Sequence, residues 1–161
     1  MRIAIVSDTH SRHATIEATL KLLEQCQVEL ILHCGDIEDS EAVWLFPGNT
    51  HFVFGNCDTE RASIRQAVYG SGATLHEPFG RLELGGAKIA WLHGDDRRLM
   101  QEVEHQGEFD YLFYGHTHVA AERRTGPTRV VNPGALHRAR AKTFLVLDID
   151  SGEMETIVVA D

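Results

Sequence analysis

The chain has 161 residues, of which 43% are hydrophobic and 24% charged, a composition typical of one globular domain with a buried core. Its formal net charge of −9 argues against general binding to nucleic acid and against an acidic membrane surface. Three cysteines at wide spacing fit neither a disulfide framework nor a structural zinc site, so we expect a protein of the reducing cytoplasm. The first apolar run, Ile3–Val6, is too short for a secretory signal or a membrane span. We therefore expect a single domain over residues 1–161, with no membrane partner.

Five short apolar stretches each lead into a turn that carries a polar residue, the pattern of strands in a covered sheet. They are Ile3–Val6, Leu30–Leu32, Phe52–Phe54, Ile89–Leu92 and Tyr111–Tyr114. Apolar residues recur at helical spacing over 16–26, and 42–46 and 99–103 are shorter helical segments. Two hairpins are expected, one joining 81–84 to 87–91 and one joining 143–150 to 154–159, so the second half has an antiparallel character. Together these elements predict a mixed α/β fold with two packed sheets and helices outside.

Each of the five apolar stretches is followed by a side chain that can bind a metal ion. Because ligands of covered α/β sheets bind beyond the carboxyl ends of the strands, these side chains are expected to converge. Two pairs of them are separated by two positions, a spacing that puts both side chains on one side of an extended segment. The candidate metal ligands are Asp8, His10, Asp36, Asn56, His93, His116 and His118.

This candidate set is too large for one tetrahedral zinc site. It suits two divalent ions about 3.5–4 Å apart that share one carboxylate, an arrangement used for hydrolysis at phosphorus. Nitrogen and oxygen donors without thiolate favour Mn²⁺, with Fe, Zn²⁺, Co²⁺ or Ni²⁺ as alternatives. Two such ions would outweigh the two carboxylates, so the cavity would attract a phosphate ester even on an acidic chain.

The order of these motifs resembles the five sequence blocks of calcineurin-like metallophosphoesterases. The blocks are Asp8-x-His10, Gly35-Asp36, Gly55-Asn56-x-Asp58, His93 and Gly115-His116-x-His118. The short chain and its Gly55-Asn56-Cys57-Asp58 segment are similar to the small prokaryotic YfcE-like phosphodiesterase branch, and the likeness extends through Asn132-Pro133-Gly134. The resemblance implies a four-layer α/β/β/α sandwich of two mixed sheets with flanking helices. It also implies one ion held by Asp8, His10, Asp36 and His118, and a second held by Asp36, Asn56, His93 and His116.

The same resemblance implies a phosphodiesterase that hydrolyses a small or nucleotide-like phosphate ester with a hydroxide that bridges two metal ions. Asp36, Asn56 and His93 would act through the metals. In many larger members of the superfamily a histidine after the third-block Asn assists the leaving group, whereas this chain has Cys57 as its candidate acid. A thiol with a pKa near 8.5 is a weak acid catalyst at neutral pH, so aryl diesters are expected to react faster than alkyl diesters.

Other roles are open for several of these residues and for the protein. The alternative role of Asp36 is to cap the N-terminus of the helix that follows it. The alternative role of His93 is to pack in the core without binding metal. Asp58 is expected to cap a helix or orient Asn56 rather than bind metal. The alternative functions are a non-catalytic interaction scaffold, as in the retromer subunit that resembles this family, and a phosphomonoesterase or phosphoprotein phosphatase.

The remaining histidines and the arginines carry no clear role in the sequence. His33 is expected to pack or to support a ligand, and five others are expected on the surface or in loops: His13, His51, His76, His105 and His137. Arg12, Arg138 and Arg140 are either phosphate contacts or solvated loop residues. The natural substrate, the native metal and the formation of a homo-oligomer stay open at this stage.

Overall fold

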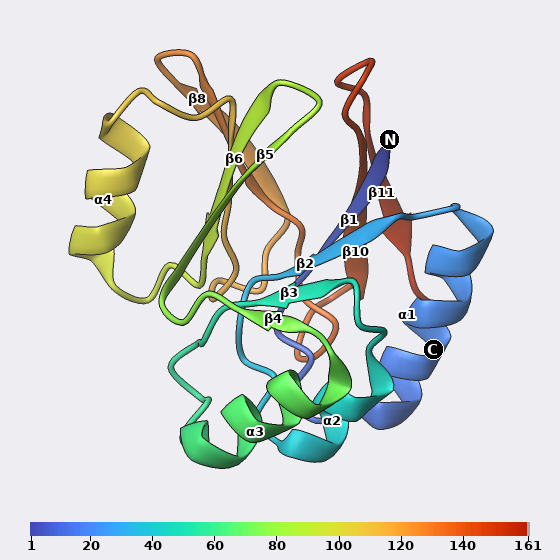
Figure 1. Cartoon of the computed structure of the whole chain (residues 1–161). Coiled ribbons are helices and arrows are strands. Elements are labelled where there is room, and N and C mark those ends of the chain that lie inside the picture. Colours follow the sequence, from blue (N-terminus) through green and yellow to red (C-terminus); the bar gives the residue numbers. More distant parts are fainter. Residues whose placement is uncertain (161) are drawn as a thin grey trace.

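The computed structural model describes residues 1–160 and consists of two β-sheets packed face to face between helices (Figure 1). The first sheet has the order β11-β10-β1-β2-β3-β4 and the second has the order β5-β6-β7-β9-β8. The strands are β1 (Arg2–Val6), β2 (Leu30–His33), β3 (Thr50–Phe52), β4 (Thr74–Leu75), β5 (Phe79–Leu84), β6 (Ala87–Leu92), β7 (Tyr111–Phe113), β8 (Ala121–Thr125), β9 (Thr128–Asn132), β10 (Thr143–Asp148) and β11 (Met154–Val158). The helices are α1 (His13–Gln25), α2 (Ser40–Leu45), α3 (Arg61–Ser71) and α4 (Arg97–His105).

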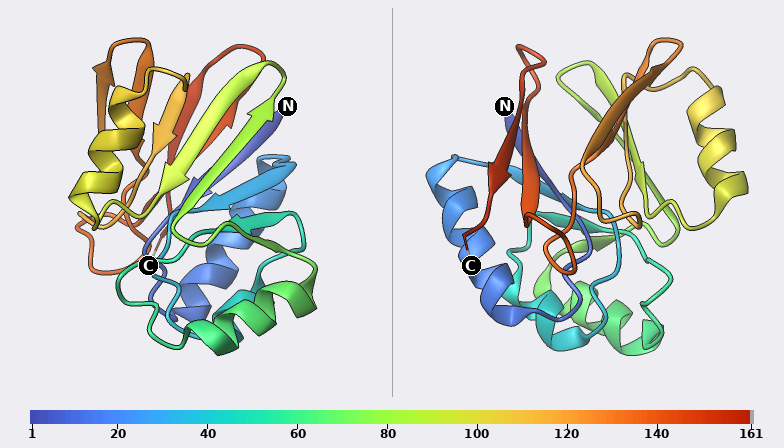
Figure 2. Two further views of the ribbon diagram at one scale, coloured as in Figure 1. Left: turned by 60° about the vertical axis from the view of Figure 1, so that its left-hand side comes forward. Right: turned by 180° about the vertical axis from the view of Figure 1, so that it is seen from behind.

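The layers follow the order α/β/β/α. Helices α1, α2 and α3 cover the outer face of the first sheet, while α4 covers the outer face of the second (Figure 2). The four-layer arrangement expected from the sequence is confirmed. No helix among residues 1–160 is long and apolar enough to cross a bilayer.

The unbroken apolar run of β1 reflects burial on both faces. Ile3 and Ile5 pack between the two sheets, where Trp91 also lies, whereas Ala4 and Val6 pack under the helices. Alternate side chains of a strand point to opposite faces, so a strand between two cores has no polar face.

The second sheet differs from the expectation in its strand directions. Strands β6, β7 and β9 run parallel, and only the hairpins β5–β6 and β8–β9 are antiparallel. The β10–β11 hairpin joins the first sheet instead, beside β1. The antiparallel character predicted for the second half is therefore wrong for the central strands, because α4 provides a crossover that returns the chain in the same direction.

The structure also contains elements that the sequence analysis did not predict, among them β4, β8 and β9, and others with different bounds. Strand β8 is mostly exposed and polar, so it has no apolar signal, and it forms by pairing with β9. Strand β3 is Thr50–Phe52 rather than Phe52–Phe54, although the Val53 and Phe54 N–H groups still donate to the His33 carbonyl at 3.2 Å and the Glu77 carbonyl at 2.7 Å. Helix α3 buries Ile64, Ala67 and Val68, a spacing of three and four residues that is typical of a helix packed on a sheet.

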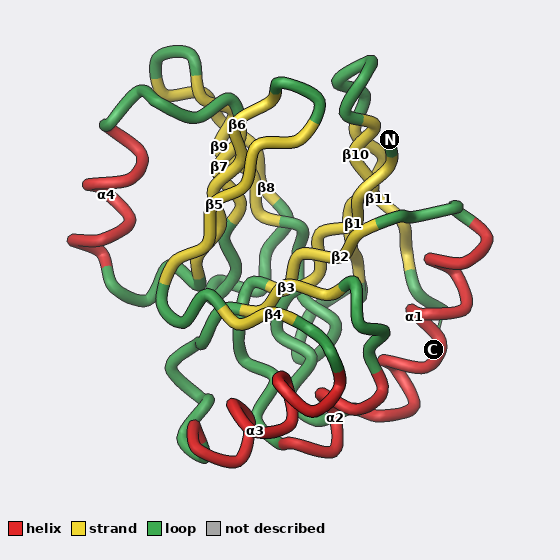
Figure 3. The backbone as a smooth tube through the Cα atoms, viewed as in Figure 1, coloured by secondary structure: helices red, strands yellow, loops and turns green. Residues whose placement is uncertain are grey.

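The loops that follow β1, β2, β3, β6 and β7 gather at one end of the two sheets (Figure 3). Every one of the seven candidate metal ligands lies in or at the start of one of these loops. The fold thus brings together residues that are far apart in the chain.

Candidate metal centre

Four candidate ligands from three loops form one group of converging donor atoms. Single donor atoms of Asp8, His10, Asp36 and His118 all lie within 4.8 Å of one another. His118 Nε2 lies 3.2 Å from Asp8 Oδ1 and 3.3 Å from His10 Nε2. His10 Nε2 lies 3.6 Å from Asp36 Oδ2. This is the group that the family resemblance implies around one ion.

The other three candidates form a second group around the side-chain oxygen of Asn56, and His93 connects this group to Asp36. His93 Nε2 lies 3.2 Å from Asp36 Oδ2 and 2.9 Å from Asn56 Oδ1. His116 Nδ1 lies 3.1 Å from the same Asn56 oxygen. Asp36 Oδ2 therefore faces both groups, which is the position that a shared carboxylate requires.

The backbone at this end of the sheets is unusual. Five of the seven candidates have φ in the left-handed region: Asp8, His10, Asp36, His116 and His118. The expectation that each two-residue spacing marks an extended segment is therefore wrong, because these residues lie in left-handed turns after the strands. Both members of each pair still reach the same cluster. Non-glycine residues in this region are strained, and such strain concentrates at functional sites.

Two glycines let the loops approach this closely. A Cβ on Gly55 would lie 2.2 Å from Asp36 Oδ1, and one on Gly115 would lie 1.9 Å from Ser7 Oγ and 2.7 Å from Asp8 Oδ2. Any side chain at either position would collide with a carboxylate of the cluster. Glycine permits this contact because it has no Cβ.

The donor set fits divalent metal ions. Asp8 is fully buried, and its Oδ1 is a buried side-chain oxygen without a hydrogen-bond partner in residues 1–160. Its other oxygen, Oδ2, accepts hydrogen bonds from Ser7 Oγ at 2.6 Å and from the His116 backbone N–H at 3.2 Å. A buried carboxylate oxygen that lacks a partner is costly unless an ion completes its coordination.

Hydrogen bonds to the outer nitrogens orient three of the imidazoles. The Nδ1–H groups of His10, His93 and His118 face the Glu38 carboxylate at 2.6 Å, the Cys34 carbonyl at 2.8 Å and the Arg138 carbonyl at 3.4 Å. We assign the protons to Nδ1 from these acceptors, which leaves each Nε2 facing the cluster. This is the orientation that metal-binding histidines adopt.

Charge within the cluster shifts two pKa values in opposite directions. Burial opposes ionisation of Asp36, but the hydrogen bond and charge of His93, with the Cys57 N–H and His10, outweigh it and lower the pKa of Asp36 to about 2. Burial likewise opposes protonation of His93, but the nearby Asp36 and Asp8 carboxylates raise its pKa to about 9. Without metal, the cluster thus holds an ion pair between Asp36 and His93.

Two buried residues hold the loops without facing the cluster. The Asp58 carboxylate accepts hydrogen bonds from the backbone N–H groups of Asp36 at 2.9 Å, Glu38 at 2.7 Å and Gly55 at 2.7 Å. Helix α3 starts after Glu60, so the capping role considered for Asp58 is wrong. His33 Nδ1 accepts from the Gly35 N–H at 3.1 Å, and burial followed by the charge of His93 lowers the pKa of His33 to about 3. His33 is therefore a neutral supporting residue.

The alternative roles of two ligand candidates are also decided by geometry. Helix α2 is capped by Asp39, whose side chain accepts from the Ala42 N–H at 2.7 Å, so Asp36 does not cap it. His93 is buried, yet its Nε2 faces the Asp36 carboxylate rather than an apolar core.

All five histidines expected on the surface or in loops have partners. His13 Nε2 lies 3.6 Å from Asp39 Oδ1, His105 Nδ1 lies 2.8 Å from the Gln101 carbonyl oxygen, and the other three contact further rings. His51 Nδ1 lies 2.9 Å from His76 Nε2, the two rings stack at 5.2 Å, and both rest against Trp91. The His137 ring lies 5.5 Å from that of His10 at the edge of the cluster. No pattern in the sequence connects the paired rings, because each pair lies in segments that only the fold brings together.

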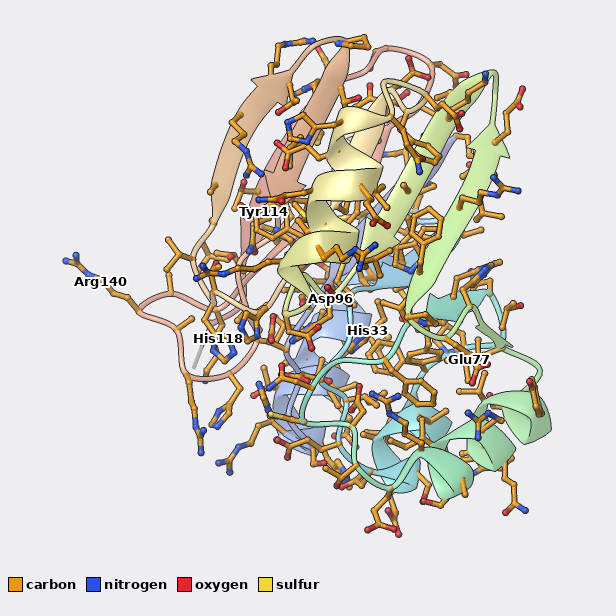
Figure 4. The ribbon with its side chains drawn as sticks, turned by 90° about the vertical axis from the view of Figure 1, so that its left-hand side faces the viewer. His33, Glu77, Asp96, Tyr114, His118 and Arg140 are labelled. Atoms are coloured by element: carbon orange, nitrogen blue, oxygen red, sulfur yellow. The ribbon has the colours of Figure 1, made fainter. Side chains whose placement is uncertain are left out.

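Residues 137–140 form a loop next to the cluster that sequence reasoning left aside. The Arg138 carbonyl holds His118, and Arg12 Nη2 lies 3.3 Å from His137 Nε2. Figure 4 shows Arg140 on the loop beyond His118, with its side chain directed away from the cluster. Of the three arginines considered as phosphate contacts, Arg12 thus lies near the cluster and Arg140 points to solvent.

Glu38 is the supporting residue that the sequence analysis missed most clearly. Glu38→Ala is expected to weaken Mn²⁺ binding about 10–100-fold, because the mutation removes the carboxylate that orients His10. The dissociation constant is measured by calorimetry on metal-free protein. Glu38→Gln, which keeps an acceptor, should restore part of the affinity, and Glu41→Ala on the exposed start of α2 should leave it unchanged. Equal affinity in Glu38→Ala and the unmutated protein would contradict this role.

Comparison with known proteins identifies the family. Phosphodiesterase MJ0936 of Methanocaldococcus jannaschii is 26% identical over 165 residues, which cover 99% of this chain and 99% of that protein. The solved structure of an archaeal phosphodiesterase superposes with a TM-score of 0.89 at 25% identity and covers 98% of this chain and 99% of that one. The phosphoesterase YfcE from E. coli shares the fold, with a TM-score of 0.73 at 18% identity over 99% of this chain and 100% of that one.

The family assignment rests on nearly the full chain. Residues 1–152 match the calcineurin-like phosphoesterase superfamily domain. This match includes every loop that contributes to the cluster. The chain is therefore a member of the calcineurin-like phosphoesterase superfamily and a phosphoric ester hydrolase.

Proposed function

We propose that the chain is a phosphodiesterase that works with two divalent metal ions, Mn²⁺ in the first place, on a small or nucleotide-like phosphate ester. The observation that carries the proposal is the position of Asp36 Oδ2, which lies 3.6 Å from His10 Nε2 in one donor group and 3.2 Å from His93 Nε2 in the other. Phosphodiesterase MJ0936 is similar to this chain over nearly its whole length, and this similarity supports the same proposal.

The proposed ligand roles follow the two donor groups. One ion would be held by Asp8, His10, Asp36 and His118, and the other by Asp36, Asn56, His93 and His116. When bound, two such ions would activate a water molecule for attack on phosphorus and neutralise the charge of the phosphoryl oxygens.

The chain's own residues preorganise this site. Asp58 holds the Asp36 and Gly55 loops by backbone hydrogen bonds, and Glu38 and the Cys34 carbonyl fix two imidazoles. These supports are buried or partly buried, and they hold the donor loops against one another. Such preorganisation is what electrostatic stabilisation of a transition state needs.

Cys57 contributes little acid catalysis in this proposal. Burial, together with the Asp36 carboxylate, raises the pKa of the Cys57 thiol to about 11. A proton held this tightly is not transferred to a leaving group at neutral pH. Departure of the leaving group then depends on its own acidity.

Hydrolysis of a series of aryl methyl phosphodiesters tests the function. With Mn²⁺ present, kcat/KM is expected to exceed that of the matching aryl monoesters and to fall steeply as the pKa of the leaving phenol rises. Cys57→Ser should leave this slope unchanged, as should Cys26→Ser, a matched change distant from the cluster. A higher kcat/KM for monoesters than for diesters, or a rate independent of leaving-group pKa, would contradict the proposal.

The remaining proposals concern the location of the protein, its domain organisation and the type of substrate. The cysteines at 26, 34 and 57 are all free, which supports a reducing, cytoplasmic location. We also propose that residues 1–161 act as one domain with a small-molecule substrate.

A further inference from the structure

A small cavity adjoins the His93 side of the donor cluster. It has a volume of about 160 Å³ and shares His93 and Gly55 with the cluster. Its other walls come from three elements and include Phe54, Arg61 and Leu99. Figure 4 shows Asp96, another wall residue, at the start of α4. The cavity therefore shares one wall, made by His93 and Gly55, with the donor cluster.

The size of the cavity limits what it can hold. Pockets for drug-sized ligands span about 300–1,000 Å³. A cavity of about 160 Å³ has room for one ring system rather than for a whole nucleotide.

The walls favour a planar group. The Arg61 guanidinium lies over the Phe54 ring, 4.9 Å from its centroid, and its Nε donates to the Asp58 carbonyl at 3.2 Å. These two contacts hold the guanidinium plane in place on the cavity wall. A planar cation held in this way is a surface on which aromatic rings and nucleobases stack.

The charges at the rim disfavour an anion. Asp95 and Asp96 are exposed and line the cavity on the side of α4. Asp96 also accepts hydrogen bonds from the Arg98 and Leu99 backbone N–H groups, which fixes its position. Carboxylates accept hydrogen bonds from ring N–H, amino or hydroxyl groups and repel further phosphates.

We infer that this cavity is the subsite for one ester arm of the substrate, and that the arm is an uncharged planar group the size of an aryl ring or a nucleobase. The inference rests on the proposed phosphodiesterase function, since the cavity matters only if phosphorus is held at the adjoining cluster. It narrows the substrate class to diesters with a neutral aromatic arm.

Binding of two non-hydrolysable phosphonates tests this inference. Phenylphosphonate and methylphosphonate have the same anionic group and differ in the ring. The Mn²⁺-loaded protein is expected to bind phenylphosphonate at least about tenfold more tightly in calorimetry, because the ring is buried. 4-Carboxyphenylphosphonate should lose this advantage, because its added charge meets Asp95 and Asp96.

Leu99 offers a matched pair of variants. Leu99→Trp fills the cavity and should bring the two affinities to within about twofold, whereas Leu99→Ala enlarges it and should keep the preference for the ring. Unchanged methylphosphonate affinity in Leu99→Trp shows that the cluster is intact. Equal binding of both phosphonates by the unmutated protein, or a ring preference that survives Leu99→Trp, would overturn the subsite.

The failure of the subsite and the failure of the proposed function give different results. If the subsite is wrong, both phosphonates bind alike and aryl diesters are still hydrolysed. If the proposed function is wrong because the cluster binds no metal, neither phosphonate binds and no diester is hydrolysed. If it is wrong because the chain is a monoesterase, both phosphonates bind and aryl monoesters are hydrolysed in preference to diesters. Either result overturns the subsite as well, since the subsite is defined for a diester arm.

Discussion

Asp36→Asn is expected to lower kcat for an aryl phosphodiester by about a thousandfold, the scale seen when one preorganised electrostatic group is removed from an active site. Asp36 Oδ2 faces both donor groups, at 3.6 Å from His10 Nε2 and 3.2 Å from His93 Nε2. An amide at this position has no negative charge to share between two ions. The protein should therefore lose metal as well as rate, which elemental analysis of the purified variant measures alongside kcat.

The substitution keeps the local fold. Asp36 Oδ1 accepts a hydrogen bond from the Cys57 N–H at 2.8 Å, and an asparagine oxygen can do the same. Asp39→Asn is the matched control, because Asp39 caps α2 and asparagine is an equally good cap. Asp39→Asn should keep full activity. An Asp36→Asn protein that retains two metal ions and its rate would show that the shared ligand lies elsewhere.

Removal of metal is expected to abolish hydrolysis, and Mn²⁺ is expected to restore it with a pH dependence set by His93. For Nε2 of His93 to bind a metal ion, the proton that it shares with Asp36 must leave. Because Asp36 and Asp8 raise the pKa of His93 to about 9, metal binding competes with protonation at every pH below about 9. If the pKa of His93 had its ordinary value, protonation would compete with metal binding only below about pH 6.

The apparent Mn²⁺ affinity should therefore rise up to about tenfold per pH unit between pH 6.5 and 8.5, with release of one proton per protein. Calorimetry in buffers of different ionisation enthalpy measures both quantities. Asp36, with a pKa of about 2, stays ionised throughout and adds no slope. The role of His93 would be contradicted by an Mn²⁺ affinity that does not change with pH over this range. The metal requirement would be contradicted if the metal-free protein were as active as the metal-loaded protein.

The raised pKa of His93 also affects the stability of the metal-free fold, which it favours at acidic and neutral pH. The folded pKa of His93, about 9, lies above its ordinary value of 6.5, and that of Asp36, about 2, lies below its ordinary value of 3.8. The Asp36–His93 pair therefore contributes fully between pH 3.8 and 6.5 and is lost as pH rises through 9 or falls through 2. His33 acts in the opposite sense. Its folded pKa of about 3 means that stability falls as pH drops from 6.5 toward 3.

Much of the fold and family was predictable from local patterns. The short apolar runs of β1, β2, β6 and β7 each end in turn residues, which is typical of strands. The glycine pair between β5 and β6 is typical of a hairpin turn. Strand β8 was not predictable in this way, since its exposed polar residues resemble a loop and its pairing partner decides its structure. The direction of β7 and β9 likewise depends on crossovers and not on any residue within the strands.

The sequence by itself determined which seven side chains are candidates for the metal centre, because strand ends, donor chemistry and motif order can all be read along the chain. Only the tertiary structure decided how those side chains are held and charged. Glu38 reaches His10 across 28 positions, Asp58 reaches Asp36 across 22, and Cys34 reaches His93 across 59. Such contacts have no fixed spacing in the sequence. The same holds for the high pKa of His93 and for the cavity beside it, since burial and the distance to a carboxylate exist only after the two sheets have packed.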